Sequence, residues 1–286
     1  MVGVLTDTTA SIPQPLVNEL DIEVVPYRIH KGLDTLLDMV EVQPDPFAKF
    51  LETTDMLPTT SNPSIGDYLA GLKRLAERTC DIVALTMTSK GSGAYQSCRA
   101  AVEILRERMP SVQAEVVDTL KVAMSQGWAV IEAARSALAG ANLTGVVNRA
   151  IDVAHRSTMV MTADTLRYLY MGGRIGQAQH LVGSLLSIKP LIGVEEGAIV
   201  ALGAARTRAK AYARMVEIAC QQVGAGARVK AAFTHVAALD QVERLRALTL
   251  SQLNCIEELT TQLSPALAVH AGPGTVGMSL FASGAA

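Results

Sequence analysis

The fold is decided by residues 81–119, which read DIVALTMTSKGSGAYQSCRAAVEILRERMPSVQAEVVDT. The first seven residues of this stretch form a short apolar run that predicts a buried strand, and residues 114–119 predict another. Between them, residues 94–109 carry apolar side chains at helical spacing. A strand, a long helix and a second strand predict a crossover that joins parallel strands of one sheet.

The same alternation continues on both sides of this stretch. Residues 2–6 (VGVLT) predict a buried strand, and the run DIEVVPYRI at 21–29 predicts an extended segment. Helical spacing recurs at 65–79, and two helices are expected between the strand at 114–119 and His155. We therefore expect residues 1–156 to form an α/β domain whose sheet is mostly parallel.

A second cycle of strands and helices predicts another α/β domain over residues 157–286. Residues 189–203 resemble a hairpin that turns at Glu195, Glu196 and Gly197, so this domain should contain a mixed sheet. The other expected elements are a strand at 157–164, helices at 176–188, 207–223 and 239–253, a strand at 227–235, and extended runs at 255–260 and 265–270. Within the first of these helices, an apolar band would serve either as core or as the lining for an apolar ligand; it consists of Leu181, Val182, Leu185, Leu186 and Ile188.

Composition argues against several classes of protein. The chain has 286 residues with 25 Lys and Arg against 27 Asp and Glu, and only one Trp, six Tyr and four Phe. Neither a basic excess nor a base-stacking surface is evident, so we expect no nucleic-acid partner. No apolar run approaches the roughly 20 residues that cross a bilayer, and the N-terminal residues do not read as a secretory signal.

The four cysteines lie far apart in the sequence, at Cys80, Cys98, Cys220 and Cys255. This spacing predicts neither a disulfide framework nor a metal site. We expect the thiols to pack as small apolar side chains in a reducing cytoplasm.

Four loops are crowded with hydroxyls or glycines, and they read TDTTAS (6–11), LPTTSNPS (57–64), TSKGSGAYQS (88–97) and HAGPGTVG (270–277). Loops at the carboxyl ends of parallel strands converge on one crevice, where ligands tend to bind. We therefore expect side chains that are distant in sequence to lie near one another there, namely Asp7, Ser89, Ser92 and Asp118.

Several residues of these loops are candidates for binding. Ser92 stands between two glycines just before a helix, and it is either an ordinary helix cap or, with the backbone of Gly93, part of an anion site. Ser64 is a natural cap for the helix at 65–79, which leaves Thr60 and Ser61 without a structural task. Such a cluster of hydroxyls can also be an ordinary polar loop.

The last of these loops contains a GxGxxG pattern at residues 272–277, but only nine residues follow and none of them is acidic. A dinucleotide site needs a following helix and an acidic residue about 20 positions on. We interpret these glycines as a tight turn with positive φ. His270, which precedes the turn, either faces the crevice or is structural.

Two arginines lie near predicted helix ends. Arg174 follows paired glycines, and Arg206 precedes the helix at 207–223. Arginine suits the phosphates or carboxylates of a partner, although solvated charge at a helix end explains both positions equally well.

Taken together, the motifs resemble the DegV family of fatty-acid-binding proteins. The resemblance runs through eight ordered blocks, which read TDTTAS, PTTSNPS, TSKGSGAYQS, VVDT, ADTLRYLYMGGRI, GSLLSIKPLI with GAIV, ARTRAKA and HAGPGTVG. The chain departs from the family pattern at Asn62, Lys90, Gly91, Ala94, Ala204 and Ala205. The change at Ala204 and Ala205 weakens the case for a basic docking role there.

The resemblance implies two α/β domains with a long-chain fatty acid, such as one of sixteen or eighteen carbons, in a tunnel between them. It implies no cofactor and no catalysis by this chain, because a separate fatty-acid kinase would convert the presented carboxylate to an acyl phosphate for phospholipid synthesis. The implied carboxylate ligands are Thr60, with Ser61 as an open alternative, and Ser92 with Gly93, beside His270. Arg174 and Arg206 match positions associated with docking of the kinase.

Physical chemistry is consistent with this assignment. Burial of the 14 methylenes of a sixteen-carbon chain at ~0.8 kcal/mol each would supply roughly 11 kcal/mol, so specificity must come from the head group. Desolvating a carboxylate costs several kcal/mol unless it is hydrogen-bonded. We expect neutral hydroxyl donors, without an arginine or lysine that would hold the anion too tightly.

A different class of protein uses some of the same residues. In a serine hydrolase or acyltransferase, Ser92 would be the nucleophile, His270 the base, and Asp7 or Asp118 the group that orients the base. The missing GxSxG elbow argues against this alternative.

Overall fold

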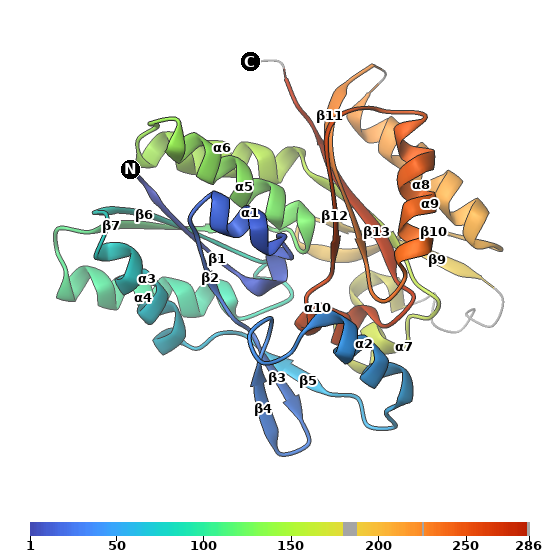
Figure 1. The fold of residues 1–286 in the computed structure, drawn as a ribbon, viewed down its shortest axis with the longest axis horizontal. Coiled ribbons are helices and arrows are strands. Elements are labelled where there is room, and N and C mark those ends of the chain that lie inside the picture. Colours follow the sequence, from blue (N-terminus) through green and yellow to red (C-terminus); the bar gives the residue numbers. More distant parts are fainter. Residues whose placement is uncertain (180–187, 225, 285–286) are drawn as a thin grey trace.

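The computed structural model describes residues 1–179, 188–224 and 226–284. This part of the chain contains a parallel sheet, a larger mixed sheet and a small third sheet, with helices packed around them (Figure 1). The prediction of an α/β fold with one mostly parallel and one mixed sheet is confirmed.

The parallel sheet has the strand order β2-β1-β6-β7, and all of its strand pairs are parallel. Its strands are β1 (Gly3–Asp7), β2 (Ile22–Val25), β6 (Asp81–Thr86) and β7 (Gln113–Asp118). Alternate residues face opposite sides of a strand. Ile82 and Ala84 therefore pack against α3 (Ile65–Ala76) and α4 (Ala94–Arg108), whereas Val83 and Leu85 pack against α5 (Met124–Leu138) and α6 (Leu143–Arg156).

The mixed sheet has the strand order β10-β9-β8-β13-β11-β12, in which β11 and β12 alone pair in parallel. One face packs on α8 (Arg208–Val223) and α9 (Leu239–Leu250). The hairpin turn predicted at Glu195 to Gly197 is confirmed. The strands are β8 (Thr158–Thr162), β9 (Lys189–Glu195), β10 (Ala198–Ala205), β11 (Arg228–His235), β12 (Asn254–Gln262) and β13 (Val276–Ala282).

Helix α5 lies between the two large sheets, and twelve of its fifteen residues are buried. On one side it packs on β1 and β6, and on the other side Trp128 donates a hydrogen bond of 3.2 Å to the backbone oxygen of Ser279 in β13. A helix that is covered on all sides needs small and apolar residues around its whole circumference. Most of the sequence MSQGWAVIEAARSAL is small or apolar, and its buried polar residues Gln126 and Glu132 have hydrogen-bond partners.

A small antiparallel sheet of order β4-β3-β5 was not anticipated. The extended run expected at 21–29 is divided at Pro26, because proline lacks the N–H that a continuous ladder needs. Its first part is β2, and its last two residues belong to β3 (Arg28–Lys31), which pairs with β4 (Asp34–Leu37) and β5 (Thr59–Ser61). Three further short helices complete this half of the chain, namely η1 (Thr8–Ala10), α1 (Gln14–Glu19) and α2 (Pro44–Thr53).

The expectation of an extended run at 265–270 was wrong. These residues belong to α10 (Pro265–Ala271), because Ser264 caps the helix by accepting from the N–H of Leu267 and Pro265 occupies the first turn, where it needs no donor. The prediction also missed β13, which lies at the centre of the mixed sheet between β8 and β11. The tight turn predicted at residues 272–277 is confirmed: it joins α10 to β13, with φ of 78° at Gly272 and 79° at Gly274.

Part of the predicted helix at 176–188, with most of its apolar band, lies outside the described residues; residues 176–179 form a short 3-10 turn. The domain boundary at residue 156 stays a prediction. The strands of the parallel sheet precede it and those of the mixed sheet follow it, yet one core cluster contains both Leu5 and Ile192.

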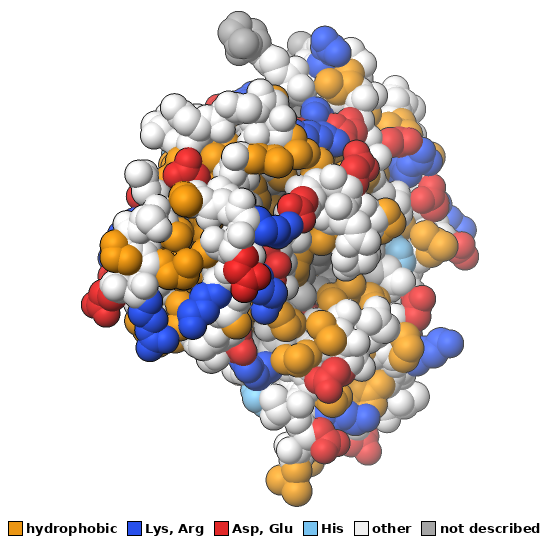
Figure 2. Space-filling model, turned by 60° about the vertical axis from the view of Figure 1, so that its left-hand side comes forward, with side chains coloured by type: hydrophobic (Ala, Val, Ile, Leu, Met, Phe, Trp, Pro, Cys, Tyr) orange, Lys and Arg blue, Asp and Glu red, His pale blue; other side chains and the backbone are white. Residues whose placement is uncertain are grey.

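All four cysteines are free. Cys98 is buried as expected, whereas Cys80 is exposed, so the expectation that every thiol packs inside was wrong. No helix of the described residues is long and apolar enough to cross a membrane. On the face shown in Figure 2, acidic and basic side chains are interspersed.

A buried ion cluster joins the helices of the first half to the mixed sheet. Glu132 of α5, whose side chain is 7% exposed, accepts hydrogen bonds from Lys230 Nζ at 2.8 Å, from Arg135 at 3.0 Å and from Arg149. Burial alone would raise the pKa of Glu132, but these cations outweigh burial and lower it to about 2. The carboxylate is therefore held ionised at the interface.

Replacing Glu132 by glutamine should lower the free energy of unfolding by about 3 kcal/mol at neutral pH, since Arg149 loses this buried anion and Lys230 and Arg135 keep only Glu257. The folded pKa lies below the unfolded one, so this contribution is present above about pH 4.3 and is lost as the pH falls toward 2. Urea denaturation of both proteins across this range measures it. The control Glu258→Gln, at a surface pair with Arg246, should cost less than about 1 kcal/mol. Equal effects of the two variants would contradict the interpretation.

Candidate functional site

A cavity of about 460 Å³ lies where the carboxyl edge of the parallel sheet meets the mixed sheet. Its apolar walls come from both halves of the chain, and they include Met87 after β6, Met159 and Met161 of β8, Ile192 and Val194 of β9, Ile199 of β10, and Leu267 of α10. This volume lies within the range of small-molecule sites in proteins. All four loops expected to converge do reach this cavity, through Thr9, Thr60, Ser92 and His270 among others. Of the four side chains expected there, only Ser92 is among the described residues that line it, whereas Asp7, Ser89 and Asp118 are not.

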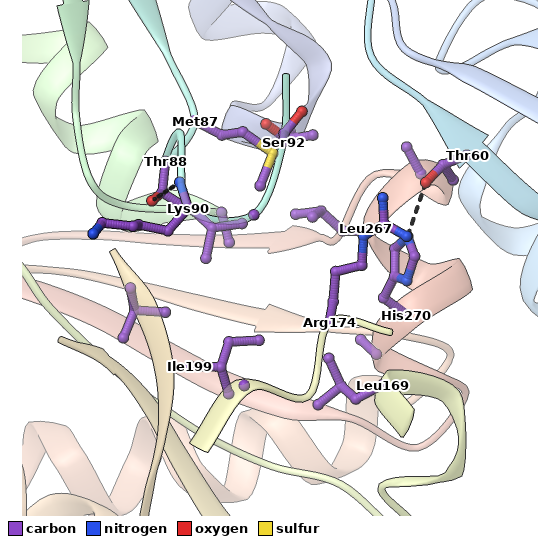
Figure 3. A pocket seen from close by; sticks show the side chains of 18 of the residues that line it. Thr60, Met87, Thr88, Lys90, Ser92, Leu169, Arg174, Ile199, Leu267 and His270 are labelled. Carbon is purple, nitrogen blue, oxygen red and sulfur yellow. Dashed lines mark hydrogen bonds between the residues drawn. The ribbon is translucent and has the colours of Figure 1, made fainter. Parts of the chain in front are cut away.

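Polar side chains gather at one end of the cavity. Thr60 and His270 are hydrogen-bonded there, and the Arg174 side chain extends alongside the His270 ring, with Leu169 below it and Ile199 farther away (Figure 3). Ser92 lies on the loop above them. We call the part of the cavity around Thr60, His270 and Ser92 its polar end; Thr88 and Lys90 add polar groups elsewhere on a largely apolar wall.

The two neighbouring hydroxyls of β5 point in opposite directions, because successive side chains of a strand alternate. Thr60 Oγ1 lies 2.8 Å from Nε2 of His270, whereas Ser61 Oγ lies 2.9 Å from Nε2 of His30 on the other face of the small sheet. Both residues border the cavity. The TTS motif, expected as a loop, thus directs the Thr60 hydroxyl to the polar end and engages the Ser61 hydroxyl elsewhere.

Of the two roles that the sequence left open for Ser92, the structure shows the contact that caps a helix, and the role in an anion site stays a prediction. Ser92 Oγ accepts from the N–H of Ala94 at 3.2 Å, which helps to cap α4, and it also lies 2.7 Å from the phenol oxygen of Tyr27. Both side chains line the cavity. Gly93 is the N-cap residue of α4, and a Cβ there would lie only 3.0 Å from Oδ1 of Asn62.

His270 is the last histidine of the chain and sits in the final turn of α10. Burial, with a smaller contribution from the charge of Arg174, lowers the pKa of His270 to about 4, so the ring is neutral at pH 7. Its Nδ1 is buried and has no hydrogen-bond partner among the described residues. A lone acceptor is tolerated better in this position than a lone N–H. This favours the tautomer in which Nε2 carries the proton and donates to Thr60.

Gly172 makes room for this ring. A Cβ at position 172 would overlap Nδ1 of His270 and would lie 2.9 Å from Cε1. Gly172 directly follows α7 (Arg167–Met171), so the paired glycines noted in the sequence end a helix and admit the imidazole at the same point.

The two candidate arginines lie in different places. Arg174 lines the cavity, donates to the backbone oxygen of Gly172 at 2.7 Å and is exposed. The expectation that neutral donors hold the head group stays a prediction, and the structure adds to it that Arg174 lies beside His270 (Figure 3). Lys90 also lines the cavity, next to Thr88. Arg206 is exposed and is not among the described residues that line the cavity.

The two candidate carboxylates are engaged away from His270. Asp7 is fully buried and accepts from the backbone N–H groups of Thr9 and Met87, at 3.1 Å and 3.3 Å. Asp118 accepts from the N–H of Ser89 at 3.2 Å. Neither is hydrogen-bonded to His270 in the part of the chain that the structure describes. The Ser–His–Asp arrangement expected of a hydrolase is not assembled by these contacts.

Comparison with known proteins identifies the family that the sequence motifs resemble, over almost the whole chain. Residues 1–283 match a family model described as "Uncharacterised protein, DegV family". The chain belongs to the DegV family. It is 34% identical to a DegV domain-containing protein of Streptomyces coelicolor, with 97% of each chain covered, and 31% identical to one of Halalkalibacterium halodurans, with 98% covered. A DegV family protein from Thermus thermophilus, whose structure is described as showing fatty-acid binding, superposes with a TM-score of 0.92 at 29% identity and covers 99% of both chains.

Sequence reasoning missed two residues at the polar end of this DegV cavity. Tyr27 lies in an apolar run that predicts an extended segment, and nothing in that run signals a phenol beside Ser92. Gly172 was noted as a helix breaker, but its contact with His270 joins positions that are almost a hundred residues apart. The paired glycines before Arg174 were the available signal.

Replacing Gly172 by alanine should displace the imidazole of His270 and break its hydrogen bond to Thr60, because the new methyl group overlaps the ring. We expect a loss of about 1–3 kcal/mol in the free energy of unfolding, measured by urea denaturation. Gly66→Ala is the control, since a Cβ there meets only Ser64 Oγ at 3.6 Å. If both variants unfold at the same urea concentration, the close contact does not position His270.

Proposed function

We propose that this chain binds a long-chain fatty acid in the cavity and presents its carboxylate to a separate fatty-acid kinase. The observation that carries the proposal is the composition of the cavity wall, which is largely apolar and carries hydroxyls from two distant segments, Thr60 and Ser92. The fatty-acid binding described for the Thermus thermophilus protein supports it. The acyl phosphate formed by the kinase would enter phospholipid synthesis, and this chain would need no cofactor of its own.

The apolar walls suit an acyl chain. Met87, Met159 and Met161 contribute flexible thioether side chains to the wall, and methionine adapts to irregular apolar shapes. Burial of the methylenes of a sixteen-carbon chain would be worth roughly 11 kcal/mol. This contribution retains the ligand but does not orient it.

The free donors and acceptors of the two hydroxyls explain how the polar end would orient the ligand. A hydroxyl has one proton and two acceptor positions. Thr60 accepts from Nε2–H of His270 and keeps its own proton for a ligand. Ser92 accepts from the N–H of Ala94, and it keeps its proton for a ligand when the phenol of Tyr27, 2.7 Å away, is the donor of their shared hydrogen bond. Two such protons can donate charge-assisted hydrogen bonds to a carboxylate. Ser61, whose hydroxyl is bound to His30, is not assigned to the carboxylate.

Arg174 would add a positive charge near the head group. It is exposed and also lines the cavity, so it can contact both the ligand and a partner at the cavity mouth. Arg206 is exposed without lining the cavity. We assign Arg174 to the head group and to kinase docking, and Arg206 to docking alone.

Removing the hydroxyls should weaken fatty-acid binding without unfolding the protein. Ser92→Ala and Thr60→Val should each raise the dissociation constant for palmitate by about tenfold or more, because each removes a donor to a charged group. Titration calorimetry measures the affinity, and mass spectrometry of the extracted lipid identifies the natural ligand. The control Thr53→Val removes a hydroxyl from the exposed end of α2 and should change neither. Unchanged affinity in both cavity variants would reject the head-group assignment, and a covalent acyl adduct on Ser92 would favour the hydrolase alternative.

Docking is tested separately from lipid binding. Arg206→Ala should bind palmitate as the unmodified protein does, yet lower the rate at which a fatty-acid kinase forms acyl phosphate, by about tenfold if the side chain lies at the centre of the interface. Arg244→Ala, which removes an exposed arginine from α9, serves as the control. An unchanged rate with Arg206→Ala would remove Arg206 from the docking surface.

A further inference from the structure

A buried phenol stands at the polar end of the cavity, and the function proposed above does not assign it a role of its own. Tyr27 is 5% exposed, lines the cavity, and its Oη lies 2.7 Å from Oγ of Ser92. A buried tyrosine hydroxyl normally has a hydrogen-bond partner, and here Ser92 provides it.

The backbone holds Tyr27 firmly on both sides. Its N–H donates to Oγ1 of Thr8 at 3.1 Å, and its carbonyl oxygen accepts from the N–H of Asp38 at 2.9 Å. Its ring belongs to the core cluster that also contains Tyr68 and Ile29. The phenol oxygen therefore has little freedom to leave Ser92.

The partners of Ser92 leave two directions open for its hydrogen bond to Tyr27, and only one of them keeps the serine proton free. One acceptor position of its Oγ is taken by the N–H of Ala94, which leaves one acceptor position and one proton. Burial, and to a lesser degree the charge of Asp7, raises the pKa of Tyr27 well above its ordinary value, so the phenol keeps its proton. If Tyr27 donates to Ser92, both acceptor positions of Ser92 are filled and its proton is left for a ligand.

We propose that Tyr27 is a positioning residue of the head-group site, which donates to Ser92 and thereby directs the serine proton toward the carboxylate of the bound ligand. This inference rests on the proposed function. In addition to that function, Tyr27 would strengthen the preference of the site for a carboxylate over an uncharged head group. Tyr27 acts through Ser92 and does not itself contact the carboxylate.

The test compares a fatty acid with its alcohol. In Tyr27→Phe, which keeps the ring and removes one oxygen, the dissociation constant for palmitate should rise by about tenfold. The dissociation constant for hexadecanol, which has the same chain length and no charge, should stay unchanged. A purely structural role of Tyr27 would weaken binding of both ligands equally and would overturn the proposal.

A double-mutant cycle tests the route through Ser92. In the Ser92→Ala background, Tyr27→Phe should cause no further loss of palmitate affinity, because the hydroxyl that it positions is absent. A further loss would show that the phenol contacts the ligand directly, and it would overturn the positioning role.

The matched control is Tyr68→Phe, which removes another buried phenol oxygen. Oη of Tyr68 lies 3.4 Å from Oδ2 of Asp7, and Tyr68 is not among the described residues that line the cavity. The Tyr68→Phe variant should therefore keep the affinity of the unmodified protein for palmitate. Urea denaturation of all variants confirms that each is folded. If the unmodified protein fails to bind palmitate, the proposed function fails; if it binds and Tyr27→Phe binds equally well, only the inference about Tyr27 fails.

Discussion

The site depends on one constraint of hydrogen bonding. A hydroxyl at the end of an apolar cavity can donate to an anion only if its proton is not already used within the protein. In the proposed head-group site, Thr60 and Ser92 meet this condition if their neighbours donate to them: a neutral imidazole to the threonine, and a helix N–H and the Tyr27 phenol to the serine. An anion can then be desolvated without being held by a fixed cation alone.

This constraint requires the two halves of the chain to keep a fixed position relative to each other. Thr60 belongs to the small sheet, whereas its partner His270 is on α10, which follows β12 of the mixed sheet. The halves are joined by α5, which packs against both large sheets, and by the cluster around Glu132 and Lys230. Because a hydrogen bond weakens steeply with distance and angle, such a site needs this extensive interface behind it.

Close contacts between backbone and side chain complete the arrangement. The ring of His270 occupies space that only a glycine at 172 leaves free, and Asn62 approaches α4 at Gly93. Each contact joins two of the sequence blocks by which the family is recognised. These blocks therefore contain residues at which two segments approach closely, as well as residues that face the cavity.

Local sequence patterns are enough to predict the alternation of strands and helices, the parallel and mixed character of the two sheets, the turn at 272–277 and the loops that border the cavity, because hydrophobic period and glycine chemistry are local properties. They did not determine that 265–270 is helical, that residues 276–282 form a central strand, or that β5 turns Thr60 and Ser61 to opposite sides. Nor could they place Tyr27 beside Ser92 or Arg174 beside His270. Those features depend on contacts between segments that are far apart in the chain, and only tertiary packing decides which partner each polar group meets.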